Sequence, residues 1–166
     1  MRIRSLSPLD REPLVAMVSE SWQGAATFRP AEVSCAIELL DAALARAEGN
    51  TYEVLVADEP VGDAAVGRPV GYVCFGQTPM TEATFDLYWL VVSASERGRG
   101  LGRALVSGFE DHLRERGART VRVETSSLEG QGGASRFYES AGYRRAGVIP
   151  DFYRAGDDLL IFAKAL

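Results

Sequence analysis

The sequence predicts an α+β fold, in which a mixed sheet is combined with helices. Strand patterns are in the majority and helix patterns are inserted between them. Two of the strand patterns flank a single helix pattern, so we expect them to pair in parallel through a right-handed crossover. The chain has 166 residues, of which 46% are hydrophobic and 25% charged, and these are ordinary values for one globular domain. We therefore expect a single domain over residues 1–166.

The first half of the chain predicts a strand, two helices and a β-hairpin. Pro8 and Pro30 each suit the first turn of a helix, and Gly49 suits the end of the second helix. A segment rich in Gly and Pro at 58–69 separates two alternating segments that should form the hairpin. The expected elements are a strand at 2–6, a helix from Pro8 to about Glu20, a helix from Pro30 to Ala47, and strands at 52–56 and 70–75.

The second half predicts a strand, a glycine-rich turn and a long helix, followed by further strands. Apolar residues at a spacing of four, from Leu101 to Leu113, indicate a helix that Gly117 ends. The expected elements are a strand at 84–92, this helix, a strand at 120–125, a Gly-rich loop at 130–133, a short helix at 134–141, and strands near 143–148 and 159–163. Helices and strands therefore alternate in this half.

Charge and hydropathy exclude several classes of protein. The formal net charge is −5 and the isoelectric point is about 5.0, which argues against a nucleic-acid binder. The sequence contains no apolar segment of about 18 residues that could span a membrane, and residues 1–4 lead into no signal-peptide core. We therefore expect a cytoplasmic protein with neither a nucleic-acid partner nor a membrane partner.

Cysteine and histidine are too rare for most metal or nucleophile sites. Cys35 and Cys74 are far apart and form no CxxC pair, so we expect reduced packing residues and no metal. His112 is the single histidine, and no GxSxG or HExxH motif accompanies it, which favours a partly exposed surface position on its helix. Because no histidine is predicted near Cys74, we also expect no covalent cysteine intermediate.

The segment at 97–102 is the clearest chemical signal. Its three glycines lead into a helix N-terminus, where freed backbone N–H groups can approach phosphate oxygens. Seven arginines and three acids lie between 97 and 122, a local net charge of +4 in an acidic chain. A P-loop is absent, since Lys164 is the only lysine, and Arg103 replaces the last glycine of a dinucleotide GxGxxG motif. A flexible turn with solvated arginines is the alternative interpretation.

Two motifs resemble the GCN5-related N-acetyltransferases, a family that transfers acetyl groups from acetyl-CoA to amines. Arg97-Gly98-Arg99-Gly100-Leu101-Gly102 matches the family's pyrophosphate loop, (Gln/Arg)-x-x-Gly-x-(Gly/Ala), and follows an apolar strand at 90–92. The segment at 136–143, RFYESAGY, is similar to the family's late helix. The resemblance implies a mostly antiparallel sheet, splayed at its centre, with one parallel strand pair and about four helices. The pantetheine arm of the cosubstrate would lie in the opening.

By this resemblance, acetyl-CoA would contact the strand end, the glycine turn and the two late helices. The implied cofactor-binding residues are Leu90, Val91, Val92, Arg97, Gly98, Arg99, Gly100, Leu101, Gly102, Arg103, Arg136 and Tyr138. No metal is implied, and transfer would be direct.

Amine attack on a thioester requires a base, a donor for the developing oxyanion, and an acid for the leaving thiolate. Tyr138 is the candidate acid, because a phenol stays protonated at neutral pH; a core tyrosine is the alternative. A backbone N–H of Val91 or Val92 could bind the oxyanion. Asp86 is the first candidate base, and Glu124, on the neighbouring strand, is the second. Either carboxylate could instead be an ordinary strand residue bound to an arginine.

The acceptor is expected to be a primary amine of a small molecule or a protein N-terminus. Aromatic and acidic residues, which suit a cationic amine, occupy the segments that would surround it. The candidates are Trp22, Glu82, Asp86, Tyr88, Asp151, Tyr153, Asp157 and Asp158. The segment at 151–158 also resembles the hairpin of the branch that acetylates protein N-termini, although a simple capped turn fits it equally well. A catalytically silent CoA-binding sensor or scaffold is the alternative function, and a homodimer is left open.

Overall fold

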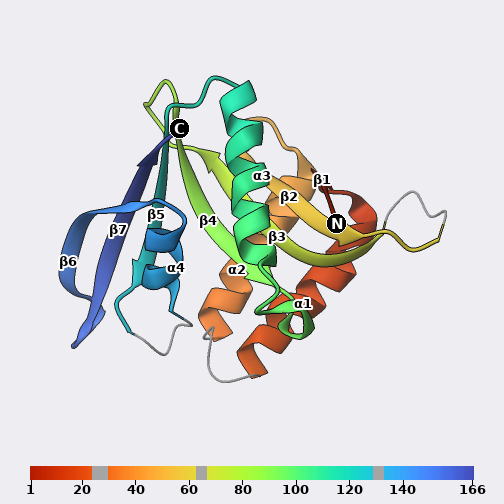
Figure 1. Cartoon of the computed structure of the whole chain (residues 1–166), viewed down its shortest axis with the longest axis horizontal. Coiled ribbons are helices and arrows are strands. Elements are labelled where there is room, and N and C mark those ends of the chain that lie inside the picture. The colour runs from red at the N-terminus through yellow and green to blue at the C-terminus, as the bar shows by residue number, and fades with distance from the viewer. Residues whose placement is uncertain (24–29, 63–66, 129–132) are drawn as a thin grey trace.

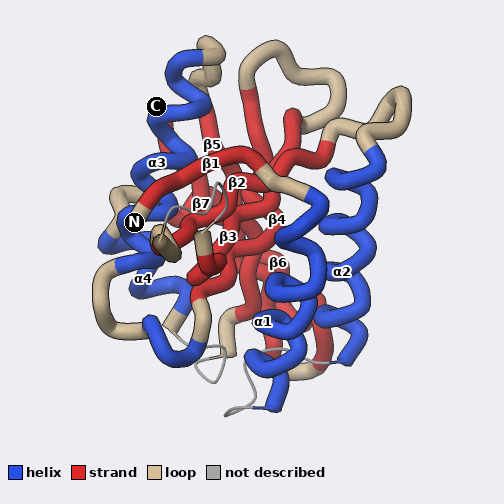
Figure 2. The backbone as a smooth tube through the Cα atoms, turned by 90° about the vertical axis from the view of Figure 1, so that its right-hand side faces the viewer, coloured by secondary structure: helices blue, strands red, loops and turns tan. Residues whose placement is uncertain are grey.

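The computed structural model describes residues 1–23, 30–62, 67–128 and 133–166, in which seven strands form one sheet between two layers of helices (Figures 1 and 2). The strands are β1 (Arg2–Ser5), β2 (Tyr52–Glu59), β3 (Arg68–Gln77), β4 (Thr84–Val92), β5 (Thr120–Ser126), β6 (Arg144–Arg154) and β7 (Asp157–Ala165). The α-helices are α1 (Arg11–Gln23), α2 (Pro30–Ala45), α3 (Leu101–Glu115) and α4 (Ala134–Ser140), and two short 3₁₀ helices are η1 (Pro8–Asp10) and η2 (Ala94–Glu96).

The sheet is mixed, as the sequence predicts. Its order is β1-β2-β3-β4-β5-β7-β6, and every neighbouring pair is antiparallel except β4 with β5. The parallel pair is short, because Thr84–Leu87 of β4 pairs with Thr120–Val123 of β5 and the two strands then diverge (Figure 1). A register shift against β3 leaves Tyr88 without a partner, so a β-bulge bends β4 where the strands separate. The splayed sheet is thereby confirmed.

Each face of the sheet carries its own apolar core. Leu105, Phe109 and Leu113 of α3 are fully buried against one face, where α4 also packs. Leu14 of α1 and Leu40 of α2 are buried against the other face, so Figure 2 shows α1 and α2 on the opposite side of the strands from α3 and α4. No helix within the described residues is long and apolar enough to cross a membrane.

The closing hairpin extends further than the sequence patterns indicate. β6 and β7 run into a tight turn, whereas the apolar patterns end near 148 and begin near 159. Asp151 ties the two strand ends together, because its backbone N–H donates to Asp158 Oδ1 at 2.9 Å and its Oδ1 accepts from Gly156 N–H at 2.6 Å. These polar bonds, which an apolar pattern does not reveal, continue the hairpin through 151–158.

Two ion-pair clusters fasten the ends of the sheet. Asp58 of β2 is fully buried and accepts hydrogen bonds from Arg2 and Arg4 of β1, with distances of 2.8 and 2.6 Å. Lys164 of β7 lies 2.8 and 2.7 Å from the two carboxylate oxygens of Glu110 in α3, and it also donates to Ala141 O. The second cluster joins α3, β7 and the end of α4.

Candidate active site

A cleft of about 1010 Å³ opens where β4 and β5 diverge. Its walls come from both strands, from the turn at 97–102, and from α2, α3, α4 and β6. It brings together most of the predicted site residues, namely Asp86, Tyr88, Leu90, Val91, Val92, Arg97, Gly98, Gly100, Leu101, Gly102, Arg103, Glu124, Tyr138 and Tyr153. The segments that the sequence marks as functional therefore meet at one place.

The glycine turn has the geometry of an anion cradle. Gly98 and Gly100 have φ values of 77° and 81°, in the left-handed region that favours glycine, and a Cβ on either would meet no atom within 4 Å. Ala104 N–H makes the first helical bond, to Gly100 O at 3.1 Å, so the amides at 101–103 point out of the N-terminus of α3. Free space and aligned amides at a helix N-terminus suit a phosphate.

The third glycine of the turn sets how closely α3 approaches α4. A Cβ on Gly102 would lie 3.3 Å from Cε2 of Phe137, which is closer than ordinary packing. The Phe137 ring in turn packs edge-on against Tyr138, with the ring centroids 5.3 Å apart. The turn therefore positions the helix that carries the candidate acid.

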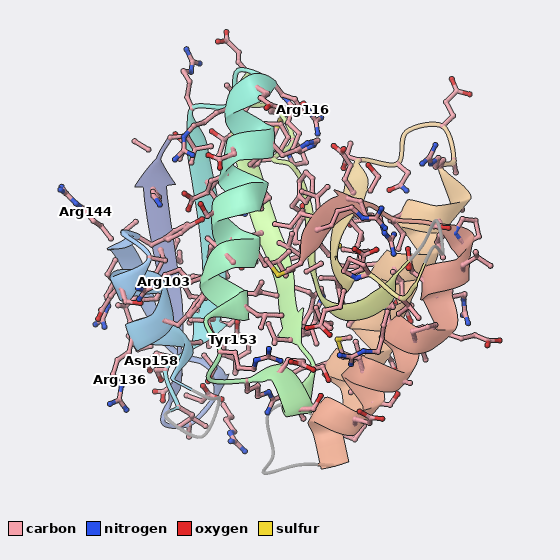
Figure 3. The ribbon with its side chains drawn as sticks, turned by 45° about the vertical axis from the view of Figure 1, so that its right-hand side comes forward. Arg103, Arg116, Arg136, Arg144, Tyr153 and Asp158 are labelled. Atoms are coloured by element: carbon pink, nitrogen blue, oxygen red, sulfur yellow. The ribbon has the colours of Figure 1, made fainter. Side chains whose placement is uncertain are left out.

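The arginines around the turn do not act as one group. Arg97 and Arg103 line the cleft, and Arg103 Nη2 donates to Ser140 Oγ at 3.1 Å. Arg99 instead forms an ion pair with Glu96 of η2 and lies outside the cleft lining. Arg136 is exposed on α4, and Figure 3 shows it at the outer edge of the molecule, whereas Tyr153 lies toward the centre.

Glu96 fastens the turn to the β2–β3 hairpin. Its carboxylate accepts from Arg68 Nη2 at 3.0 Å as well as from Arg99, and Arg68 and Arg99 both approach Glu59 of β2. The hydrogen bond from Arg68, opposed by burial and assisted by Arg99, lowers the pKa of Glu96. Arg99 therefore braces the turn from outside.

The two candidate bases share one arginine. Asp86 is 6% exposed; its Oδ1 accepts from Arg122 Nε at 2.5 Å and its Oδ2 accepts from Thr78 Oγ1 at 2.9 Å. The hydrogen bond with Asp86 is the main reason that the pKa of Arg122 is raised. Arg122 Nη1 also lies 3.3 Å from Oε1 of Glu124, whose side chain is 43% exposed. The predicted alternative, a strand carboxylate bound to an arginine, thus describes Asp86 well.

Tyr138 is buried in the core and also reaches the cleft. It is 7% exposed, and its ring packs against Phe137 and Tyr143. Burial raises its pKa, so the phenol keeps its proton at neutral pH. Burial, with a smaller contribution from the Asp86 charge, also raises the pKa of Tyr88 to about 12.

The cleft reaches both faces of the sheet, and its two mouths differ chemically. The glycine turn, Arg97, Arg103 and Tyr138 lie toward α3 and α4. On β5, Val121 and Val123 pack in the α3-side core, so the alternating side chains of Arg122 and Glu124 face the α2 side. They line this side of the cleft together with Glu32 of α2, Asp86 and Tyr88. We call this α2-side opening the acidic mouth.

Some predicted acceptor residues lie elsewhere. Glu82 precedes β4, at the end opposite the fork, and its carboxylate pairs with Arg119 Nη2 at 3.0 Å while 88% of its side chain is exposed. The side chain of Trp22 lies outside the described residues.

The aspartates of the closing hairpin make hydrogen bonds within the hairpin and to the end of β5. Asp151 and Asp158 bond within the hairpin as described above, and Asp158 N–H also donates to Ser127 Oγ at 2.9 Å. Asp157 is 1% exposed and accepts from Ser126 Oγ. These bonds hold the hairpin against the end of β5, where Tyr153 reaches the cleft.

The structure adds residues that the sequence analysis missed. Glu32, Cys35 and Leu39 of α2 line the acidic mouth, and Arg122 lies between the two candidate bases. Arg122 could have been predicted, because residues 122 and 124 of one strand face the same side of the sheet. No comparable signal marks the α2 residues, since their position depends on how the helix packs.

The two cysteines differ in exposure. Cys74 is buried in β3, as expected, and burial raises its pKa to about 12. Cys35 is exposed at the cleft, so the expectation of a packing residue was wrong for it. His112 is half-buried on α3 and touches Phe75 and Arg116, which agrees with the expected surface position. The described residues contain no group of three or more His, Cys, Asp or Glu side chains that could hold a metal ion.

A family model decides the relationship. The model of the acetyltransferase (GNAT) domain matches residues 50–145, which include the fork, the glycine turn and α4. The chain belongs to the GNAT acetyltransferase family. A solved structure from Desulfovibrio desulfuricans, described as a GNAT-family acetyltransferase, is 36% identical and covers 99% of this chain and 98% of its own, with a TM-score of 0.86.

Two named acetyltransferases are also similar to this chain, one in sequence and one in fold. The blasticidin-S acetyltransferase of Streptomyces morookaense is 41% identical over 68 residues, which are 40% of this chain and 46% of that protein. An aminoglycoside 6′-N-acetyltransferase in complex with coenzyme A has the same fold, with a TM-score of 0.74 at 18% identity over 99% of this chain and 97% of its own. The chain spans 29% to 46% of the length of the curated relatives it matches.

Proposed function

We propose that this GNAT protein transfers an acetyl group directly from acetyl-CoA to a primary amine of a small molecule or a protein N-terminus. One observation carries the proposal: a single cleft joins a phosphate-suited glycine turn to an acidic mouth, and the two meet at the β4–β5 fork. An anionic donor and a cationic acceptor can therefore approach each other from opposite faces of the sheet. The relatives named for blasticidin S and aminoglycosides support an amine acceptor.

The residues of the cleft fit acetyl-CoA. The amides at 101–103 and the side chains of Arg97 and Arg103 would hold the pyrophosphate, in the free space beside Gly98 and Gly100. When bound, acetyl-CoA would supply a thioester carbonyl that a neutral amine can attack.

A backbone donor for the oxyanion is available at the fork. Ser93 N–H donates to Val70 O of β3 at 2.9 Å, and N–H groups alternate along a strand. The N–H groups of Val92 and Leu90 therefore point toward the fork, whereas that of Val91 points toward β3. Of the two predicted donors, we propose Val92.

Proton transfer would use groups that lie on either side of the fork. Tyr138, which keeps its proton at neutral pH and lines the cleft, would protonate the leaving thiolate from the α4 side. A carboxylate of the acidic mouth would accept a proton from the acceptor ammonium. A cytoplasmic location and a homodimer stay predictions.

The first test is binding and turnover measured on the same preparation. Calorimetry with CoA and acetyl-CoA should show binding that Gly100→Asp abolishes, because a carboxylate there repels phosphate. A panel containing blasticidin S, an aminoglycoside and alanine-terminated peptides is then screened for acetyl-CoA-dependent thiol release. Binding without release from any amine would favour the silent CoA-binding module, and no binding would contradict the proposal.

A further inference from the structure

We infer that Glu124 is the base that accepts the proton of the acceptor ammonium, and that Asp86 is a positioning residue that acts through Arg122. The inference rests on the proposed function and deepens it. It reverses the order in which the sequence ranks the two carboxylates.

Asp86 is already committed on both of its oxygens. Oδ1 accepts from Arg122 Nε at 2.5 Å, Oδ2 accepts from Thr78 Oγ1 at 2.9 Å, and the residue is 6% exposed. It also lies in the part of β4 that still pairs with β5, opposite Arg122 in the register. Each Asp86 oxygen therefore already accepts a charge-assisted hydrogen bond, and burial leaves little of the carboxylate accessible to an ammonium.

Glu124 has the opposite surroundings. It is the first residue of β5 beyond the paired segment, which ends at Val123, so it lies at the fork itself. Its side chain is 43% exposed and lines the cleft. Within the described residues, its one charged contact joins Oε1 to Arg122 Nη1 at 3.3 Å, which leaves Oε2 available to an acceptor.

Arg122 connects the two carboxylates. Asp86, which also accepts from Thr78, accepts from Arg122 Nε, and Nη1 of the same guanidinium forms an ion pair with Oε1 of Glu124. An ion pair on one carboxylate oxygen favours orientations that leave the other oxygen open to the cleft, and such orientation assists proton transfer. Asp86 therefore does not need to touch the acceptor.

The proton transfers balance without a further reactant. One ammonium proton moves to Glu124 Oε2, and the neutral amine uses its freed electron pair to form the C–N bond to the acetyl carbon as the C–S bond breaks. The departing sulfur takes the phenolic proton of Tyr138. The second proton of the amine nitrogen then passes to Tyr138 and restores the phenol. Glu124 then releases its proton to solvent, so that one amide, one thiol and one proton are the products.

The variants Glu124→Gln, Asp86→Asn and the double variant separate the roles. Glu124→Gln should lower kcat by about 100-fold or more, the range for a general base, with an unchanged KM for acetyl-CoA. It should also remove the acidic limb of the pH profile of kcat/KM. Asp86→Asn should lower kcat less and keep that limb, and it should add nothing in the Glu124→Gln background. Loss of the limb in Asp86→Asn, or additive losses in the double variant, would overturn the assignment.

A second readout does not depend on turnover or on the stability of the variants. In wild-type protein with ¹³C-labelled carboxylates, saturating methylammonium chloride should shift the Glu124 resonance and leave that of Asp86 in place. The reverse pattern, or no shift at Glu124, would contradict the inference. If none of the amines in the panel makes the wild-type protein release thiol, the proposed function fails. The methylammonium shift still decides which carboxylate contacts the amine.

Discussion

The glycine turn allows a substitution whose cost can be worked out in advance. Gly100 has φ 81° and open space where a Cβ would lie, so Gly100→Ala introduces no clash and only forces alanine into the left-handed region, at about 1–2 kcal/mol. The turn can relieve that strain by leaving the cradle geometry, which CoA binding must then restore. The Kd for CoA should therefore rise about 5- to 30-fold, since 1.4 kcal/mol corresponds to tenfold.

Gly49→Ala is a matched control. Gly49 has φ 82° and equally open surroundings, but it follows α2 and lies outside the cleft lining. Gly49→Ala should lower the melting temperature by about 2–8 °C and Gly100→Ala by no more than that, whereas only Gly100→Ala should weaken CoA binding in calorimetry. Wild-type affinity in Gly100→Ala, or an equal loss of affinity in Gly49→Ala, would refute the role assigned to the turn.

Tyr138→Phe should lower kcat by about 100-fold or more and leave the Kd for CoA unchanged, as measured by thiol release and calorimetry; an unchanged rate removes Tyr138 from the chemistry. The Arg2 hydrogen bond holds the pKa of buried Asp58 well below its usual value of ~3.9. The ionised Asp58 therefore stabilises the fold above about pH 3.9, and this stabilisation is lost as the pH falls through the lowered pKa. Asp58→Asn should therefore cost about 3 kcal/mol at pH 7 and flatten the acid side of a urea-unfolding pH series, and a parallel curve would contradict this. Maleimide should modify exposed Cys35 and not buried Cys74, and it should block acetylation because Cys35 lines the cleft. The reaction should be faster at alkaline pH, because partial desolvation and the nearby Glu38 charge raise the pKa of the Cys35 thiol. Labelling of Cys74 would show that the core opens.

The parts of the site that depend on local sequence were predictable. The glycine turn and its helix are adjacent in the chain, so one motif contains both, and the parallel β4–β5 pair follows from a strand, helix and strand in succession. Tyr138 was found because its motif lies on one short helix. In each case the interacting groups lie within one supersecondary unit.

The parts of the site that depend on packing between distant segments were not predictable from the sequence. The bulge at Tyr88 exists only in register with β3, and the link between Asp86 and Arg122 joins residues 36 positions apart. Arg99 belongs to the predicted loop motif, yet it lies outside the cleft lining and its charge is paired with Glu96. A motif gives the position of a residue along the chain but does not give the partner that its side chain selects.

The scarcity of lysine has a chemical consequence for a protein proposed to handle a reactive thioester. Guanidinium groups carry 17 of the 18 Lys and Arg charges, and acetyl-CoA does not readily acylate a guanidinium because it keeps its proton. The one lysine amine, Lys164 Nζ, donates to both Glu110 oxygens and to Ala141 O, and it is not part of the cleft lining. The side chains of the protein therefore offer the proposed donor few competing amines, so the acyl group would be reserved for an amine that enters the cleft.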